Sequence, residues 1–264
     1  MRKAILIGFE YRLGKRLPGI TVDLYLMYKF LRSKDWKNEE IIIFTDVRKD
    51  YHTKVLKKSI LEKNVGSDIL VFIEELKERK QYYEFVTNGH YNNFSSIFSG
   101  CENLFVYYTG HSKDKNIVLP NSLPLSFEVF TSFLSKSKEV FCIMDCCSGG
   151  ITLPFICHEN VFRFENEIFY KSKILSIASS LSHENSITSI VGSIFTKKIL
   201  SIIQEGNLSI YKILSLCSCL SGTRDRQTIN ISATYPDIRY IFPWFYSKPN
   251  LKILVTPFFV SIEK

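Results

Sequence analysis

The stretch EVFCIMDCCSGG, Glu139 to Gly150, decides the fold. Its apolar part, Val140 to Met144, is a continuous run of the kind that forms a strand buried on both faces. The run stops at Asp145, Cys146 and Cys147, and a Ser-Gly-Gly turn follows. We therefore expect these three side chains at the carboxyl end of the strand, which is the edge where open α/β sheets bind ligands.

A second strand with a reactive end precedes it in the sequence. Asn103 to Thr109 is apolar and aromatic, and the residues that follow bring His111 to the same edge. A thiol and an imidazole on two strand ends are the components of nucleophilic catalysis. Cys147 is the candidate nucleophile, because the turn projects it outward and supplies N–H groups that favour a thiolate. His111 is the candidate general base.

Other interpretations of these residues stay open. A buried free cysteine is common in protein cores, and a lone histidine in a loop is more often structural than catalytic. His183, which follows a later strand, is an alternative base. A metal site of His111, Cys146 and Cys147 fits the residue types. Adjacent cysteines, however, point to opposite sides of a strand, and no second C-x₂-C pair stands at zinc-ligand spacing.

Two carboxylates are candidates for substrate specificity. Asp145 follows the nucleophile strand directly, and Asp23 lies at the start of an expected helix. A carboxylate at the floor of a cleft pairs with an Arg or Lys side chain through charge-assisted hydrogen bonds. For Asp23, the favourable interaction of an acid with a helix N-terminus is a sufficient alternative explanation.

Composition narrows the class of protein. The chain has 264 residues, of which 45% are apolar, and a formal net charge of +8. Its basic residues form no block with interleaved aromatics, so we expect no nucleic-acid partner. The first apolar run, Ala4 to Phe9, is too short for a signal peptide or a membrane span, so we expect no membrane association. Seven cysteines without zinc-ligand spacing indicate free thiols and a reducing, cytoplasmic location.

Apolar runs alternate with segments of helical periodicity, and this order predicts an α/β fold. The first strand, helix and second strand form a unit whose strands should be parallel. We predict a three-layer sandwich with a mostly parallel central sheet and helices on both faces. Strands are expected at 3–8, 40–45, 103–109, 140–144, 173–179 and 227–233; helices at 22–32, capped by Thr21, at 53–63, 68–79, 126–134, capped by Ser126, 189–204 and 208–220; and a helix stub with a loop at 153–166.

The motifs at the two strand ends resemble those of metacaspases, caspase-fold cysteine peptidases that cleave after Arg or Lys. VYYTGH, which ends at His111, is similar to the histidine motif of that family, and IMDCCSGG, which contains Cys147, is similar to its cysteine motif. The resemblance covers Lys3 to about Pro243. Its weaker parts are KAILIGF, LPGITVD, IIIFTD and QTINIS, together with ILSIASSLSHENS and GSIFTKKIL, which resemble segments that shape the substrate cleft.

This resemblance implies a fold and a set of roles. Residues 1–247 would form one caspase-like peptidase domain, with 248–264 as a tail packed on it. Cys147 and His111 would form the catalytic dyad. The backbone N–H groups of Ser112 and Cys147 would stabilise the oxyanion. Asp23, Thr109 and Asp145 would form the S1 pocket for a basic P1 residue.

Three features depart from the family pattern. Ser112 replaces the glycine that usually follows the histidine, and a serine would distort a site that needs positive φ. Ser148-Gly149-Gly150 replaces His-Ser-Gly after the nucleophile. The acidic loop through which many members depend on calcium is missing, since KDKNIVLPNSLPLS at 113–126 contains only one acid, Asp114. We therefore expect no metal, no other cofactor, and activity that does not depend on calcium.

The sequence thus predicts a metacaspase-like cysteine endopeptidase that acts on protein or peptide substrates with a basic P1 residue. The altered residues Ser112 and Ser148 motivate an alternative, a catalytically inactive caspase-fold protein that binds a partner or regulates it. A free-thiol redox or zinc-binding module is a third interpretation.

Overall fold

A computed structural model gives the fold of most of the chain. No helix in the part that it describes has the length and apolar character needed to cross a membrane. The described residues are 1–11, 15–17, 19–46, 68–78, 96–120, 124–148, 150–151, 153–158, 161–164, 170–181, 184–186, 188–189, 191–204, 213, 228–236 and 242–245.

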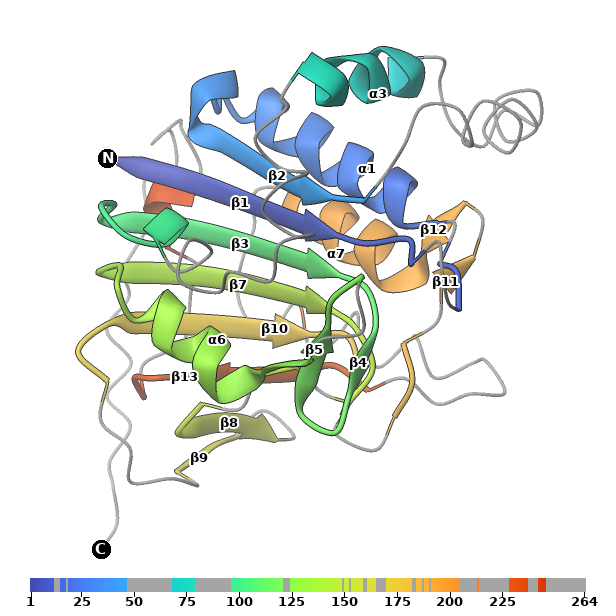
Figure 1. Cartoon of the computed structure of the whole chain (residues 1–264). Coiled ribbons are helices and arrows are strands. Elements are labelled where there is room, and N and C mark those ends of the chain that lie inside the picture. The colour runs from blue at the N-terminus through green and yellow to red at the C-terminus, as the bar shows by residue number, and fades with distance from the viewer. Residues whose placement is uncertain are drawn as a thin grey trace, which may run out of the picture.

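An eight-stranded sheet forms the centre of the structure (Figure 1). Its first five strands are parallel, and each of the last three runs antiparallel to the strand before it. In spatial order the strands are β2 (Ile41–Thr45), β1 (Arg2–Gly8), β3 (Asn103–Thr109), β7 (Glu139–Asp145), β10 (Lys173–Ala178), β13 (Asn230–Ala233), β8 (Phe155–His158) and β9 (Val161–Phe164).

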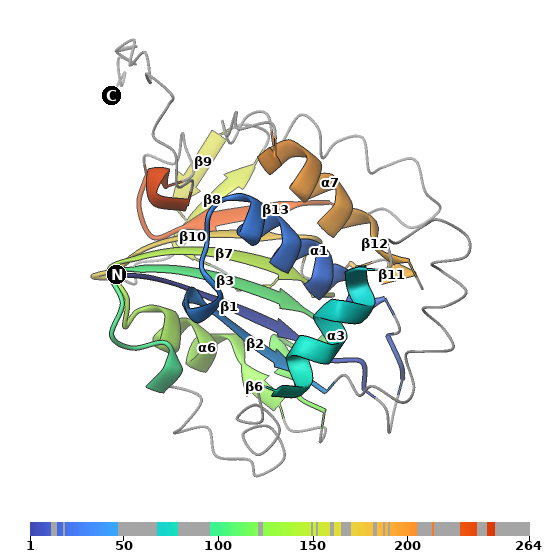
Figure 2. The same cartoon turned by 90° about the horizontal axis from the view of Figure 1, so that it is seen from above.

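Helices cover both faces of the sheet, as the view from above shows (Figure 2). α1 (Ile20–Ser33) and α7 (Ile194–Gln204) lie on one face, and α6 (Phe127–Leu134) lies on the other. α3 (Asp68–Glu78) packs against α1, and the short 3₁₀ helix η1 (Asn38–Glu40) leads into β2. The predicted three-layer sandwich with a mostly parallel sheet is therefore confirmed.

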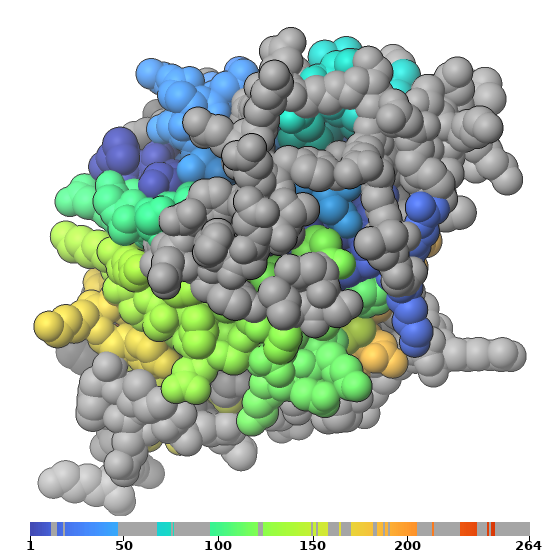
Figure 3. Space-filling model, in the orientation of Figure 1, coloured from blue at the N-terminus to red at the C-terminus, as the bar shows by residue number. Residues whose placement is uncertain are grey.

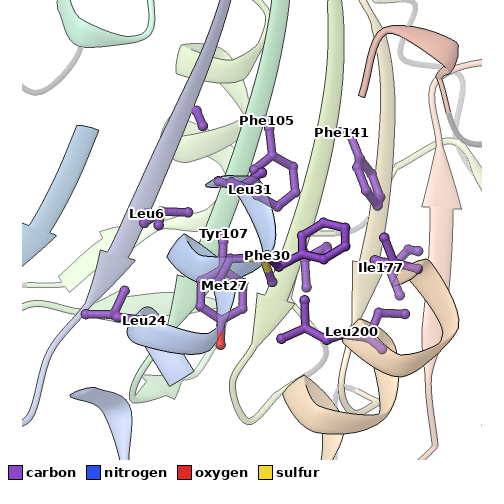
Figure 4. Close-up of a cluster of buried hydrophobic side chains, with 14 of the residues drawn as sticks. Leu6, Leu24, Met27, Phe30, Leu31, Phe105, Tyr107, Phe141, Ile177 and Leu200 are labelled. Carbon is purple, nitrogen blue, oxygen red and sulfur yellow. The ribbon is translucent and has the colours of Figure 1, made fainter. Parts of the chain in front are cut away.

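Alternation of side chains along the strands builds two cores. In β3, Phe105 and Tyr107 join the core beneath α1 and α7, whereas Leu104 and Tyr108 join the core beneath α6. Successive side chains of a strand point to opposite faces, so each parallel strand supplies both cores. Figure 4 shows the first core, where strand residues Phe105, Phe141 and Ile177 lie near helix residues Met27, Leu31 and Leu200.

The carboxyl ends of the five parallel strands form one edge of the sheet, at the right of Figure 1. Two small antiparallel sheets lie beside this edge. In Figure 3, the green and yellow-green atoms below the centre of the visible face include residues of α6 and of the three-stranded sheet. The three-stranded sheet contains β4 (Ser112–Lys113), β5 (Asn116–Val118) and β6 (Pro124–Ser126), and the other contains β11 (Thr188–Ser189) and β12 (Gly192–Ser193).

Most predicted elements agree with the structure, but three predictions were wrong. The helix predicted at 189–204 begins only at Ile194, because residues 188–189 and 192–193 pair as strands β11 and β12 instead. The region 153–166, predicted as a helix stub and loop, contains the hairpin strands β8 and β9, because β8 pairs with β13. Thr21 does not cap α1: the helix begins at Ile20, and the Thr21 hydroxyl donates to Glu10 Oε1 instead. Ser126 does cap α6, since its Oγ accepts the Val129 N–H at 3.1 Å.

Several predictions lie outside the described residues. They are the helix at 53–63, nearly all of the helix at 208–220, the alternative base His183, and the division between a domain and a tail at residue 247. Within the expected domain, close to that division, Pro243–Phe245 forms the 3₁₀ helix η3. Phe245 is fully buried, and its ring centroid lies 4.8 Å from that of Phe105.

Candidate active site

The pairing of β3 with β7 brings His111 and Cys147 to the same edge. Thr109 and Asp145 are partners in register, and each of the two candidates follows its strand by two residues. The two loops are tied together, because the Gly110 N–H donates to Asp145 O at 3.2 Å and the Ser112 hydroxyl donates to Cys147 O. Both His111 and Cys147 are partly exposed, so a substrate can reach this edge.

The His111 ring is held by the loop that follows β1. Its Nε2 lies 2.7 Å from Lys15 O, and its ring centroid lies 4.5 Å from that of Tyr11. A carbonyl oxygen only accepts hydrogen bonds, so Nε2 carries the proton in this contact. In the neutral imidazole, Nδ1 is then left as the nitrogen that can accept a proton.

The Cys147 sulfur contacts a loop that follows β10. Sγ accepts the Ser186 N–H at 3.4 Å, and the Ser148 N–H donates to Glu184 O at 3.1 Å. Glu184 is itself anchored, because its carboxylate accepts the N–H and hydroxyl of Thr228 at 2.7 and 2.8 Å. Among the described residues, Cys147 Sγ makes no hydrogen bond to His111; such bonds are often long in a free enzyme and tighten when substrate binds.

The neighbouring Cys146 differs from Cys147 in its surroundings. Cys146 is buried in the core beneath α6, and burial raises the pKa of its thiol to about 12. Such a thiol stays protonated at neutral pH and is a poor nucleophile. Of the two adjacent cysteines, only Cys147 is therefore placed to react with a substrate.

Asp23 and Asp145 lie together on the α1 and α7 face of the sheet, and both are buried. Asp145 accepts hydroxyl hydrogens from Ser186, at 2.7 Å, and Thr196, at 2.6 Å. Asp23 Oδ1 accepts the Ser193 N–H at 2.8 Å, but Oδ2 has no hydrogen-bond partner among the described residues. Burial raises the pKa of both carboxyls, and the charge of Asp145 raises that of Asp23 further.

Thr109 and Tyr107 complete the surroundings of this acid pair. Thr109 is buried next to Asp145 in the sheet register. Tyr107 Oη lies 2.6 Å from Thr196 Oγ1. Because the Thr196 hydroxyl donates to Asp145, Tyr107 is the donor in this contact. The three predicted S1 residues are thus brought to one place, with Ser and Thr hydroxyls around them.

The two serines that depart from the family pattern, Ser112 and Ser148, differ in backbone conformation. Ser112 lies in β4 and does not have positive φ, so this position tolerates a side chain. Ser148 has φ +61°, a conformation that favours glycine, at the turn after the nucleophile. The distortion anticipated at Ser112 is therefore absent, and the unusual backbone lies at Ser148.

Sequence reasoning missed four residues that shape this site: Tyr11, Tyr107, Ser186 and Thr196. Ser186 and Thr196 lie within the segments expected to form the cleft, and nothing else in the sequence pointed to a role for them. Tyr107 lies within the motif VYYTGH but received no role there, and Tyr11 looks like an ordinary core aromatic in the sequence. In the part of the chain that the structure describes, no group of three or more His, Cys, Asp or Glu side chains could hold a metal ion. The expected independence of metal stays a prediction.

Comparison with known proteins identifies the fold. No family model matches the sequence, and a search of curated proteins finds no match. The structure is similar to protein GSU0716 of Geobacter sulfurreducens, with a TM-score of 0.52 and 11% identity over 93% of this chain and 96% of that one. It is also similar to caspase-1 of Spodoptera frugiperda, with a TM-score of 0.51 and 13% identity over 94% and 91%. The protein has a caspase-like fold.

Proposed function

We propose that this protein is a cysteine endopeptidase that cleaves protein or peptide substrates after Arg or Lys. The observation that carries the proposal is the register of β3 and β7, which brings the segments carrying His111 and Cys147 to the same partly exposed edge of the sheet. The caspase-like fold and the motif resemblance to metacaspases support the same reaction. The five cysteines in the described part are free, which fits work in a reducing, cytoplasmic compartment.

The reaction would begin with proton transfer from Cys147 to His111. Because Nε2 donates to Lys15 O, Nδ1 is the nitrogen that takes the proton. The thiolate attacks the carbonyl carbon after the basic residue, and the N–H groups of Ser112 and Cys147 stabilise the oxyanion. His111 then protonates the leaving amine, and water hydrolyses the thioester.

The acid pair would bind the P1 side chain. An Arg or Lys head group that enters this site meets two buried carboxylates, with Thr109 on the wall. Asp23 Oδ2, which has no hydrogen-bond partner in the described residues, is the acceptor best placed to gain one from the substrate. Charge-assisted bonds of this kind contribute roughly 1.5–3 kcal/mol each.

The test is hydrolysis of fluorogenic peptides with Arg, Lys, Asp or Leu at P1, with and without calcium. We expect turnover of the Arg and Lys peptides alone, at the same rate with calcium or a chelator, and its loss in Cys147→Ala. Cys146→Ala, which changes the adjacent cysteine, should keep its activity. Turnover that survives in Cys147→Ala, or a preference for Asp at P1, would refute the proposal.

A second function is favoured by two contacts of Cys147. The Ser112 hydroxyl donates to Cys147 O, and Cys147 Sγ accepts from Ser186 rather than from His111. A site held in this state would bind peptides without cleaving them, as a regulatory caspase-fold protein. Equilibrium binding of an Arg peptide by reduced, folded protein that shows no turnover would favour this function over the peptidase.

A further inference from the structure

We propose that Tyr11 is a positioning residue, which fixes the backbone and the imidazole of His111 in the orientation that the reaction requires. This inference rests on the proposed role of His111 as the general base. Tyr11 lies in the loop directly after β1, 100 residues before the histidine, and belongs to none of the motifs discussed above.

The first contact is with the backbone of His111. The His111 N–H donates to Tyr11 Oη at 2.8 Å, and the Tyr11 hydroxyl donates to Val118 O at 2.8 Å. The carbonyl of His111 accepts from the Tyr108 hydroxyl at 2.5 Å and from the Val118 N–H at 3.0 Å. Both polar groups of the histidine backbone are therefore fixed, which sets the direction from which its side chain leaves the chain.

The second contact is with the imidazole. The rings of Tyr11 and His111 have centroids 4.5 Å apart and planes inclined by 44°. On the same loop, Lys15 O accepts the Nε2 proton. One segment after β1 thus supplies a ring against the imidazole and an acceptor for one of its nitrogens, and no described residue makes a hydrogen bond to the other nitrogen, which can act as the base.

The backbone of Tyr11 is unusual in a way that suggests a functional constraint. Its φ is +56°, which a bulky side chain rarely adopts and which costs of order 1–3 kcal/mol. Asp46 holds this conformation, because its carboxylate accepts the N–H groups of Glu10, at 2.6 Å, and Tyr11, at 2.9 Å. Such strain persists where the surroundings enforce it, and here the result is a phenol aimed at His111.

The space beside the histidine is shaped for this phenol. A Cβ at Gly110 would lie 2.6 Å from Tyr11 Oη and 2.8 Å from Tyr108 Oη, so only glycine lets the two phenols approach. Tyr11 is buried, and burial raises the pKa of its phenol far above the usual value. Tyr11 thus stays neutral and holds His111 by hydrogen bonds and ring contact; it takes no part as an acid or base.

A purely structural role is the competing explanation, since Tyr11 also packs against Phe9, with centroids 6.2 Å apart. Tyr11→Phe distinguishes the positioning role from a packing role, because it removes the phenol oxygen and keeps the ring. Tyr25→Phe is the matched control: both tyrosines are 5% exposed, and Tyr25 lies in α1 with its hydroxyl near Lys29, away from His111.

Three quantities would be measured on the full chain: peptidase kinetics, thermal unfolding, and the imidazole tautomer of His111 by ¹⁵N NMR. We expect Tyr11→Phe to lower kcat roughly 10- to 100-fold with KM within about twofold, because misplacing a catalytic group costs rate more than binding. We also expect the wild type to hold the Nε2–H tautomer and Tyr11→Phe to show a mixture. Tyr25→Phe should match the wild type in its kinetic constants and in its imidazole tautomer.

The tautomer decides the inference even if the wild type hydrolyses no peptide. A mixture in Tyr11→Phe alone would then support the positioning role while the peptidase proposal fails. If Tyr11→Phe keeps the wild-type tautomer and kcat, or loses only thermal stability, the inference is overturned. Should Tyr11→Phe fail to fold, Asp46→Asn, which weakens the hold on the N–H groups of Glu10 and Tyr11, must show the same mixture.

Discussion

Asp23 is a fully buried carboxyl group with one oxygen that has no hydrogen-bond partner in the described part of the chain. Burial and the charge of Asp145 raise its pKa well above the usual value near 4. The folded state then binds this proton more tightly than the unfolded state does. The free energy of unfolding therefore falls as pH rises from about 4 through the pKa of the folded state.

Asp23→Asn should remove this contribution. We expect the variant to be more stable than the wild type by on the order of 1 kcal/mol near pH 7, with the difference vanishing below about pH 4. The amide oxygen can still accept the Ser193 N–H. The measurement is urea unfolding at several pH values. A variant that is less stable at neutral pH would show that Asp23 is held by partners that the account leaves out.

Gly192 lies against the same carboxylate, and it adopts φ +95°. A Cβ there would lie 2.6 Å from Asp23 Oδ1, so Gly192→Ala should displace the acid as well as strain the backbone. We expect a loss of stability of about 1–3 kcal/mol and a rise in KM for Arg and Lys peptides.

Gly100→Ala is its control, because Gly100 has φ +81° and nothing within 4 Å of the added Cβ. Gly100→Ala should lose stability through backbone strain alone, and it should leave KM for Arg and Lys peptides unchanged. Equal effects of the two substitutions on KM would indicate that Gly192 does not shape the acid pair.

Among the elements, we expect the short 3₁₀ helix η3 to contribute more to the stability of the fold than its length suggests. Phe245 packs on Phe105 and Phe141, with centroids 4.8 and 5.0 Å away, and its carbonyl accepts the Trp36 indole N–H at 3.3 Å. We expect Phe245→Ala to cost about 3–5 kcal/mol. Phe164→Ala, at a side chain that is 53% exposed in β9, should cost less than about 1 kcal/mol.

Chemical denaturation of both variants measures this difference. Similar midpoints would mean that η3 does not close the core beneath α1 and α7. The test matters for the fold as a whole, because η3 lies more than a hundred residues after β3, the strand against which it packs.

The elements that the sequence predicted best are the buried parallel strands. β1, β2, β3, β7 and β10 lie within one residue of the predicted ends, because both of their faces are covered and the apolar run marks them directly. The hairpin of β8 and β9 carried no such signal. Its strands have four residues each, and their pairing with β13 is a long-range contact that no local pattern reports.

For the whole molecule, the order of strands predicted that the candidate residues lie at one edge of the sheet, since parallel strands share one carboxyl edge. His111, Cys147 and Asp145 follow from that rule alone. Tyr11, Ser186 and Thr196 do not, because their relation to the site exists only after distant segments pack together. At 11–13% identity to the similar solved structures, the fold is shared while the chemistry has to be argued from these side chains.

Affinity labelling tests the proposed site most directly, by combining its thiol and its acid pair in one experiment. An arginyl chloromethylketone should alkylate Cys147 and no other cysteine, as located by mass spectrometry. Asp23→Asn should slow this labelling at least about tenfold and leave the rate with uncharged iodoacetamide unchanged. Labelling at Cys146 or elsewhere, or a rate that Asp23→Asn does not alter, would contradict the account.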